Sequence, residues 1–280
     1  MTSNTWNSSG PAPTCYRHPD RVSYVSCQRC NRNICPECVR NAPVGVQCLA
    51  CAADRQETHT ARSMALGAGG PVVVYTIIAL CVASFLLQRT GVAGEWTTRW
   101  VFAPFIGAEE PWRFLTAGFL HGGFLHLALN MYALWAVGSF LEQSLGRIRF
   151  VALFLLSVLG GSVAVLLLAN PMADSWWIPV LGASGGVFGL FSAVVFELRR
   201  LGGNAQSMLI IIGINLVYGF VFSGVSWQGH LGGLVTGAVL GLVYSRLQKP
   251  SQKALSYGAT AAVGIALVAL AVIKYAAVGW

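Results

Sequence analysis

Seven apolar stretches fill the sequence from residue 70 onward, and they constrain the fold more than any other feature. A helix needs roughly 17 to 25 mostly apolar residues to cross about 30 Å of hydrocarbon. The chain is 55% hydrophobic and only 10% charged, whereas soluble domains carry roughly 25% charged residues. The sequence therefore predicts an all-α polytopic membrane protein and excludes a soluble enzyme. The predicted spans are 70–88, 122–141, 150–169, 181–198, 208–224, 228–245 and 255–275.

The formal net charge of +8 follows the membrane topology, because most Lys and Arg lie at the edges of the apolar stretches. With the N-terminus in the cytosol, the cytoplasmic segments hold Arg55, Arg62, Arg147, Arg149, Arg199, Arg200, Arg246, Lys249 and Lys253. The outer segments hold Arg89, Arg99, Arg113 and Lys274. The positive-inside rule then predicts a cytoplasmic N-terminus and an outer C-terminus. We expect a cell-membrane protein of a bacterium, with no nucleic-acid partner.

Seven of the eight Cys lie between residues 15 and 51 and indicate a separate domain. With one His they form four pairs, each separated by two residues: Cys15/His18, Cys27/Cys30, Cys35/Cys38 and Cys48/Cys51. A short loop aims both donors of such a pair at one tetrahedral ion, and cytosolic thiols stay reduced. The pattern predicts two structural Zn²⁺ ions that supply the folding energy of this small domain. A reduced Cys-rich tail without metal is the alternative.

The spacing C-x2-H-x8-C-x2-C-x4-C-x2-C resembles the start of a B-box zinc finger, a module in which alternate ligand pairs share an ion. The resemblance implies one ion held by Cys15, His18, Cys35 and Cys38. It implies a second ion held by Cys27, Cys30, Cys48 and Cys51. The sequence departs from the pattern at Cys48 and Cys51, where B-boxes commonly carry His.

A few polar side chains lie inside the predicted spans, where they are costly and therefore indicate function. His126 and Asn130 are one helical turn apart on the second span, Ser184 begins the fourth within a Gly-rich stretch, and His230 begins the sixth. These spans run in the same direction, so the residues lie at similar depth. A His can take the proton of a Ser hydroxyl at neutral pH. Asn130, His126 and the Ser184 amide are the available donors for an oxyanion.

Small residues on the sixth span predict how it packs. Gly233, Gly237 and Gly241 follow His230 at four-residue spacing, and such ridges let membrane helices approach closely. We expect this ridge to pack on the fourth span and to bring His230 to Ser184. Taken singly, a membrane Ser more often bonds a backbone carbonyl of its own helix.

The outer segment from about 89 to 121 is long for a connection and is rich in aromatic residues. Connections of more than 12 to 15 residues are usually functional, and aromatic side chains suit the membrane interface. Anchoring at headgroup level and a role in substrate gating both remain open. The aromatic residues are Trp96, Trp100, Trp112 and Phe114.

Together these motifs resemble the rhomboid family of intramembrane serine proteases. The matching marks are, in order, Trp112-Arg113, the run His121, His126 and Asn130, the Gly182 to Gly185 motif, and the run His230, Gly233 and Gly237. The resemblance implies a dyad in which Ser184 is the nucleophile and His230 is first the general base and then the acid. It implies cleavage of single-span membrane proteins near the outer face, without a catalytic metal. It also implies that the Phe188 ring stacks on His230, and that the fifth helix and residues 223–228 gate the site.

The resemblance also defines the domain organisation. We expect a disordered tail over 1–13, a B-box-like zinc-binding domain over 14–53, a linker over 54–69, a six-helix protease core over 70–250 and a seventh helix over 251–280. The expected partners are single-span membrane substrates and the lipid bilayer. The zinc domain would serve regulation, anchoring or recruitment of a cytosolic protein.

Three other functions compete with proteolysis by a serine nucleophile. A non-proteolytic, rhomboid-like scaffold that binds membrane helices is the main alternative. A proton-relaying transporter is disfavoured because Glu142 and Glu197 lie at the ends of spans. A metalloprotease of the H-E-x-x-H type is excluded because that motif is absent from the sequence.

Overall fold

The computed structural model describes residues 12–41, 45–53, 70–90, 95–221 and 224–280. The chain divides into two compact units, Met1–Met64 and Ala65–Trp280, and each is described by itself. The predicted linker over 54–69 lies outside the described residues, as does the predicted tail over 1–13 apart from its last two positions.

The first unit is small and is built around its Cys residues. Strand β1 (Val39–Asn41) pairs antiparallel with β2 (Val46–Cys48), with Val39 opposite Cys48, and helix α1 (Leu49–Ala53) follows directly. Its buried cluster consists of one aliphatic side chain and five thiols: Ile34, Cys15, Cys27, Cys35, Cys38 and Cys48. So little apolar surface cannot stabilise a domain of this size unaided.

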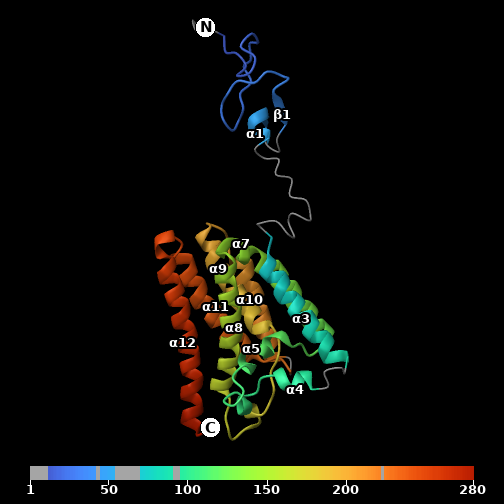
Figure 1. The fold of residues 1–280 in the computed structure, drawn as a ribbon, viewed down its shortest axis with the longest axis vertical. Coiled ribbons are helices and arrows are strands. Elements are labelled where there is room, and N and C mark those ends of the chain that lie inside the picture. Colours follow the sequence, from blue (N-terminus) through green and yellow to red (C-terminus); the bar gives the residue numbers. More distant parts are fainter. Residues whose placement is uncertain (1–11, 42–44, 54–69, 91–94, 222–223) are drawn as a thin grey trace, which may run out of the picture. The chain divides into compact units, whose positions relative to one another are not determined.

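The second unit is a bundle of helices (Figure 1). Its long helices are α3 (Val72–Thr90), α6 (Phe124–Ala133) continuing through a π-helical turn (Leu134–Gly138) into α7 (Ser139–Leu145), α8 (Arg147–Leu168), α9 (Ser184–Arg200), α10 (Gln206–Val221), α11 (Trp227–Arg246) and α12 (Lys253–Val278). In Figure 1, α12 runs along one side of the bundle and α3 along the other, with α8, α9 and α11 between them.

Several helices of this bundle are suited to a bilayer. Within the described residues, four helical stretches are long and apolar enough to cross a membrane: Val72–Thr90, Phe124–Leu145, Arg147–Leu168 and Pro250–Val278. Helix α9 is shorter, and most of its surface is buried inside the bundle. The structure confirms the predicted all-α fold, in which six helical segments are followed by a seventh, α12.

Glycines let the backbones of α9 and α11 touch. A Cβ atom added at Gly233 or at Gly237 would overlap the backbone of Gly185 or of Gly189, respectively. One added at Gly241 would lie 2.7 Å from the Cα of Ala193. The predicted packing of the Gly ridge on the fourth span is therefore confirmed.

The helix boundaries differ from the predicted spans by up to four residues, the largest difference being at Leu145. The fourth helix begins at Ser184 rather than at 181 because Gly182 has φ of +131°, which is incompatible with a helix. The third helix begins at Arg147 rather than at 150, since its first turn includes two charged residues, Arg147 and Arg149, at the end of the bundle.

The segment between α3 and α6 is packed on the bundle. It contains the short helices α4 (Trp96–Trp100) and α5 (Arg113–Thr116). The buried Arg113 guanidinium donates to the carbonyls of Thr98 and Val101 and pairs with Glu110 at 2.6 Å. Arg113 therefore holds the turns of this segment together from within.

Hydrogen bonds with three helices of the bundle, α8, α12 and α3, also hold this segment in place. Ser162 of α8 donates to the Phe114 carbonyl at 2.8 Å, and Tyr275 of α12 donates to the Pro104 carbonyl at 2.7 Å. Trp96 of the segment donates from its indole nitrogen to Ser84 of α3 at 3.0 Å. These contacts attach the segment to the bundle. Anchoring at headgroup level and substrate gating both stay predictions.

The glycine contact between α9 and α11 makes a stability prediction. We expect Gly237→Ala to destabilise the bundle by about 1–3 kcal/mol, because its methyl group forces two backbones apart. Unfolding in detergent, followed by circular dichroism, measures the change. Gly258→Ala on α12 is the matched control, since a Cβ there meets no atom within 4 Å. Equal stabilities of the two variants would contradict the described packing.

Candidate active site and metal-binding sites

Ser184 is the first residue of α9, and an extended segment precedes it. Val180 pairs with Phe102 through two backbone hydrogen bonds, and the Gly182 N–H donates to the Ala117 carbonyl at 2.9 Å. The φ of +131° at Gly182 then turns the chain into the helix. The first N–H groups of a helix lack intrahelical acceptors and lie at the positive end of its dipole. Ser184 thus has an electropositive backbone environment.

His230 lies in the first turn of α11. The hydroxyl oxygen of Ser226 caps this helix by accepting from the Gly229 N–H at 3.3 Å. The imidazole ring stacks on the Phe188 ring, with centroids 4.2 Å apart and planes inclined by 16°. The predicted stacking is confirmed, and it fixes the orientation of a ring that is only 8% exposed.

The two nitrogens of the His230 ring differ in their surroundings. Nδ1 is buried and has no hydrogen-bond partner among the described residues. It faces Gly219 of α10, where an added Cβ would lie 3.3 Å away. This leaves Nε2 as the nitrogen available for proton transfer with a neighbouring group.

Ser184 and His230 stand at adjoining helix starts. Their neighbours Gly185 and Gly229 are in contact, since a Cβ at Gly185 would lie 3.4 Å from the Gly229 carbonyl oxygen. Within the described part of the chain, however, no hydrogen bond joins the Ser184 hydroxyl to the His230 ring. In enzymes without bound substrate, such bonds are often long and tighten only in the complex.

His126 is packed against the approach to Ser184. A Cβ at Gly182 would lie 2.9 Å from His126 Nε2 and 3.7 Å from the Ser184 hydroxyl oxygen, so all three groups meet there. The Asn130 amide instead donates to the His126 carbonyl at 2.9 Å, on its own helix. His121 is buried and meets the His126 ring edge-on, with centroids 5.2 Å apart.

One cavity adjoins Ser184, and a second cavity adjoins the first. The inner one, of about 40 Å³, is lined by Ser184, Ser162 and Ser226, and it shares four lining residues with an outer cleft of about 460 Å³. His126 lines the outer cleft. A polar cavity of roughly 15 Å³ or more accommodates a water molecule. The inner cavity therefore has room for water beside the hydroxyl.

Sequence reasoning did not single out Ser226. This residue caps α11 and lines both cavities. Its signal is a Ser immediately before a predicted helix, the usual N-cap position. Of the segment 223–228 that the resemblance implicates in gating, Ser223 lies outside the described residues, while residues 224–228 line the outer cleft.

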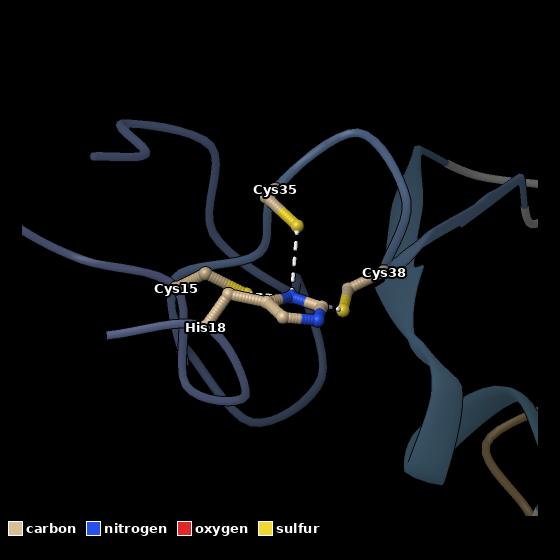
Figure 2. A group of neighbouring side chains, drawn as sticks. All are labelled: Cys15, His18, Cys35 and Cys38. Atoms are coloured by element: carbon tan, nitrogen blue, oxygen red, sulfur yellow. Dashed lines mark hydrogen bonds between the residues drawn. The ribbon is translucent and has the colours of Figure 1, made fainter. Parts of the chain in front are cut away.

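The first unit holds two groups of four metal-type donors. One consists of Cys15, His18, Cys35 and Cys38, and the other of Cys27, Cys30, Cys48 and Cys51; within each, the donor atoms lie within 4.8 Å of one another. This is the alternating arrangement that the B-box resemblance implies. Figure 2 shows the first group, in which the sulfur atoms surround the His18 ring.

The geometry of the first group fits a tetrahedral zinc ion. His18 Nδ1 lies 3.7, 3.3 and 3.5 Å from the sulfur atoms of Cys15, Cys35 and Cys38. Zinc–sulfur bonds of about 2.3 Å and zinc–nitrogen bonds of about 2.0 Å at a tetrahedral angle place such donors about 3.5 Å apart. Four protein donors without an open position are typical of structural sites.

The protonation of the thiols also favours a cation. Burial raises the pKa of Cys15, but hydrogen bonds from the Arg17 and Cys35 backbone and from His18 outweigh it and lower the pKa to about 6. Burial and the hydrogen bonds to Cys15 and Cys35 raise the pKa of Cys38 to about 11. One thiolate thus opposes ionisation of the next, and a divalent cation would stabilise both as thiolates.

Comparison with known proteins agrees with this architecture, that of a polytopic helical membrane protein with polar groups gathered at helix starts. Residues 108–247, half of the chain, match the Rhomboid domain. The chain belongs to the rhomboid family and is an integral membrane protein.

Individual relatives come from bacteria and plants. The chain is 34% identical to the rhomboid protease GluP of Bacillus subtilis over 221 residues, which cover 73% of this chain and 40% of GluP. It is 39% identical to RHOMBOID-like protein 5 of Arabidopsis thaliana over 142 residues, which cover 48% of this chain and 44% of that protein. It is 31% identical to the candidate rhomboid protease YdcA of Bacillus subtilis over 173 residues, which cover 60% of this chain and 81% of YdcA. The chain thus spans less than half the length of the first two relatives.

The donor groups predict the metal content of the protein. We expect about two Zn²⁺ per full-length chain by elemental mass spectrometry, because each group supplies four donors. Cys27→Ser combined with Cys30→Ser should leave at most one ion, since half of one ligand set is lost. Cys81→Ala is the control, because Cys81 lies in the helical bundle outside both groups. Metal-free protein with reduced thiols would contradict the assignment.

Proposed function

We propose that the protein is an intramembrane serine endopeptidase that cleaves transmembrane segments of single-span membrane proteins near the outer face. The observation that carries the proposal is the Phe188–His230 stack. It fixes the imidazole at the start of α11, beside the start of α9, where Ser184 stands. The names of the rhomboid relatives support the same class of reaction.

In the proposed reaction, the Ser184 hydroxyl oxygen attacks the scissile carbonyl carbon while His230 accepts the hydroxyl proton. Nε2 is the accepting nitrogen, because Nδ1 is buried against Gly219. The protonated imidazole then gives its proton to the leaving amine, which leaves an acyl-enzyme. Water repeats the cycle with His230 again as base. The inner cavity would hold that water.

The developing oxyanion would be stabilised by the Ser184 N–H at the positive end of α9 and by a side chain of α6. His126 is the better placed candidate, since its ring contacts Gly182 next to Ser184. Asn130 already donates to the His126 carbonyl, and it has a second amide hydrogen to offer. That bond also supports the turn of helix that carries His126.

The orientation and the metal ions complete the proposal. With the N-terminus in the cytosol, the cation-rich helix ends face the cytoplasm and the start of α9 faces outward. The two zinc ions would be structural, because each donor group is a closed set of four protein ligands. Their unit would serve regulation, anchoring or recruitment of a cytosolic partner.

The dyad predicts the behaviour of three variants. Ser184→Ala and His230→Ala should each abolish cleavage of a single-span reporter with a destabilised helix, measured in proteoliposomes. The double variant should be no worse than either one, because the two residues act as a unit. Ser192→Ala is the matched control on α9, since its hydroxyl donates to the Gly189 carbonyl of its own helix. Full activity of Ser184→Ala would instead favour a site elsewhere, and inactive wild-type protein would favour the scaffold.

The oxyanion assignment predicts a difference between two neighbouring residues. His126→Ala should lower kcat by on the order of 10², with little change in KM, because it removes a donor used in the transition state. Asn130→Ala should also lower kcat, but Asn130→Ser should restore part of it by keeping a donor to the His126 carbonyl. Unchanged kcat in folded His126→Ala would show that His126 has only a packing role.

A further inference from the structure

A basic groove lies at the end of the bundle opposite to the start of α9. It lies between the loop that joins α7 to α8 and the loop that joins α11 to α12, and its volume is about 500 Å³. All of its lining residues belong to the described part of the chain, and they include four cations and no acidic residue. The cations are Arg147, Arg149, Lys249 and Lys253.

Contacts hold two of these four cations in place around the groove. Arg149 donates to the Leu247 carbonyl at 2.9 Å and lies 5.5 Å from the centre of the Tyr244 ring, so it ties the two loops together. The Lys253 ammonium lies 5.8 Å from the centre of the Tyr257 ring. The side chains that line the groove are therefore positioned by contacts within the bundle.

Two carboxylates lie near the groove. Glu197 interacts electrostatically with Arg149, but its own hydrogen bonds are with Ser144 and Arg200. Glu142 lies 3.9 Å from Arg147 but also accepts the backbone N–H groups of Val73 and Val74 at 3.0 and 2.9 Å. Its charge is thus shared with the start of α3. Three of the four cations have no ion pair among the described residues, so the groove attracts an anion.

Two long helices also begin at this groove. Helix α8 starts at Arg147 without a side-chain cap. Helix α12 starts at Lys253, directly after the 3₁₀ turn Pro250–Gln252, in which the Gln252 side chain accepts from the Lys249 N–H at 3.3 Å. Their dipoles add positive potential to that of the four cations. A phosphate group matches both the charge and the hydrogen-bond donors.

An apolar furrow lies farther along α12. Its lining includes Ala261, Gly264, Ile265 and Val268, and its volume is about 610 Å³. Lys253, Tyr257 and Ala261 follow at four-residue spacing, so the charged and apolar parts occupy one face of the helix. A soluble phosphate would use only the groove, whereas a phospholipid would use both parts.

We propose that the groove binds the phosphate headgroup of an anionic phospholipid, with an acyl chain lying in the furrow of α12. Basic pockets between membrane helices are suited to such headgroups. The site lies apart from Ser184, and its occupancy does not depend on proteolytic activity.

Binding of phosphatidylglycerol and of phosphatidylcholine to the purified full-length chain, measured by native mass spectrometry, tests the proposal. Lys249→Gln combined with Lys253→Gln should weaken phosphatidylglycerol binding roughly thirtyfold, at about fivefold per lost cation. The control pair, Arg199→Gln with Arg246→Gln, removes two exposed cations that do not line the groove. It should bind phosphatidylglycerol like the wild type.

Three results would overturn the proposal. The two pairs of variants could lose phosphatidylglycerol equally, which would indicate general surface charge. Phosphatidylcholine could bind as tightly as phosphatidylglycerol. Inorganic phosphate at millimolar concentration could displace the lipid and stabilise the protein equally well, which would indicate a soluble ligand. If the double variant is not monodisperse, the single variant Lys249→Gln serves instead, with an expected fivefold loss.

Discussion

The contact between the glycine backbones of α9 and α11 is the interaction on which the rest of the structure depends. Between helices in lipid there is little hydrophobic driving force, so close van der Waals packing has to supply the association energy. Gly185 against Gly233 and Gly189 against Gly237 supply it here. The same contacts set the register that places the first residues of the two helices side by side.

A second layer of contacts fixes the surroundings of Ser184. Phe102 pairs with Val180 two residues before Gly182, and the segment that carries Phe102 is fastened by Tyr275 of α12. Trp280, the last residue, donates to the Phe105 carbonyl at 2.7 Å. The seventh helix therefore supports the site indirectly, through the segment between α3 and α6, and is more than an added membrane span.

The sequence predicts the features that depend on local pattern. Apolar length predicts the helices, four-residue Gly spacing predicts the α9–α11 contact, and paired Cys predict the two donor groups. The start of α9 differs from the prediction because the φ of +131° at Gly182 keeps the residues before Ser184 out of the helix. Spacing alone could not show that Asn130 bonds to its own helix while His126 approaches Ser184, since both residues share a helix face. The basic groove joins loops about a hundred residues apart, so only the fold brings it together.

Reaction with a fluorophosphonate shows whether His230 activates Ser184. The probe phosphonylates an activated serine, and mass spectrometry of the digested protein locates the adduct. The account predicts an adduct on Ser184 whose rate of formation falls by at least about 10² in His230→Ala, because general-base catalysis contributes that much. Absence of an adduct on Ser184 in folded protein, or an unchanged rate in His230→Ala, would contradict it.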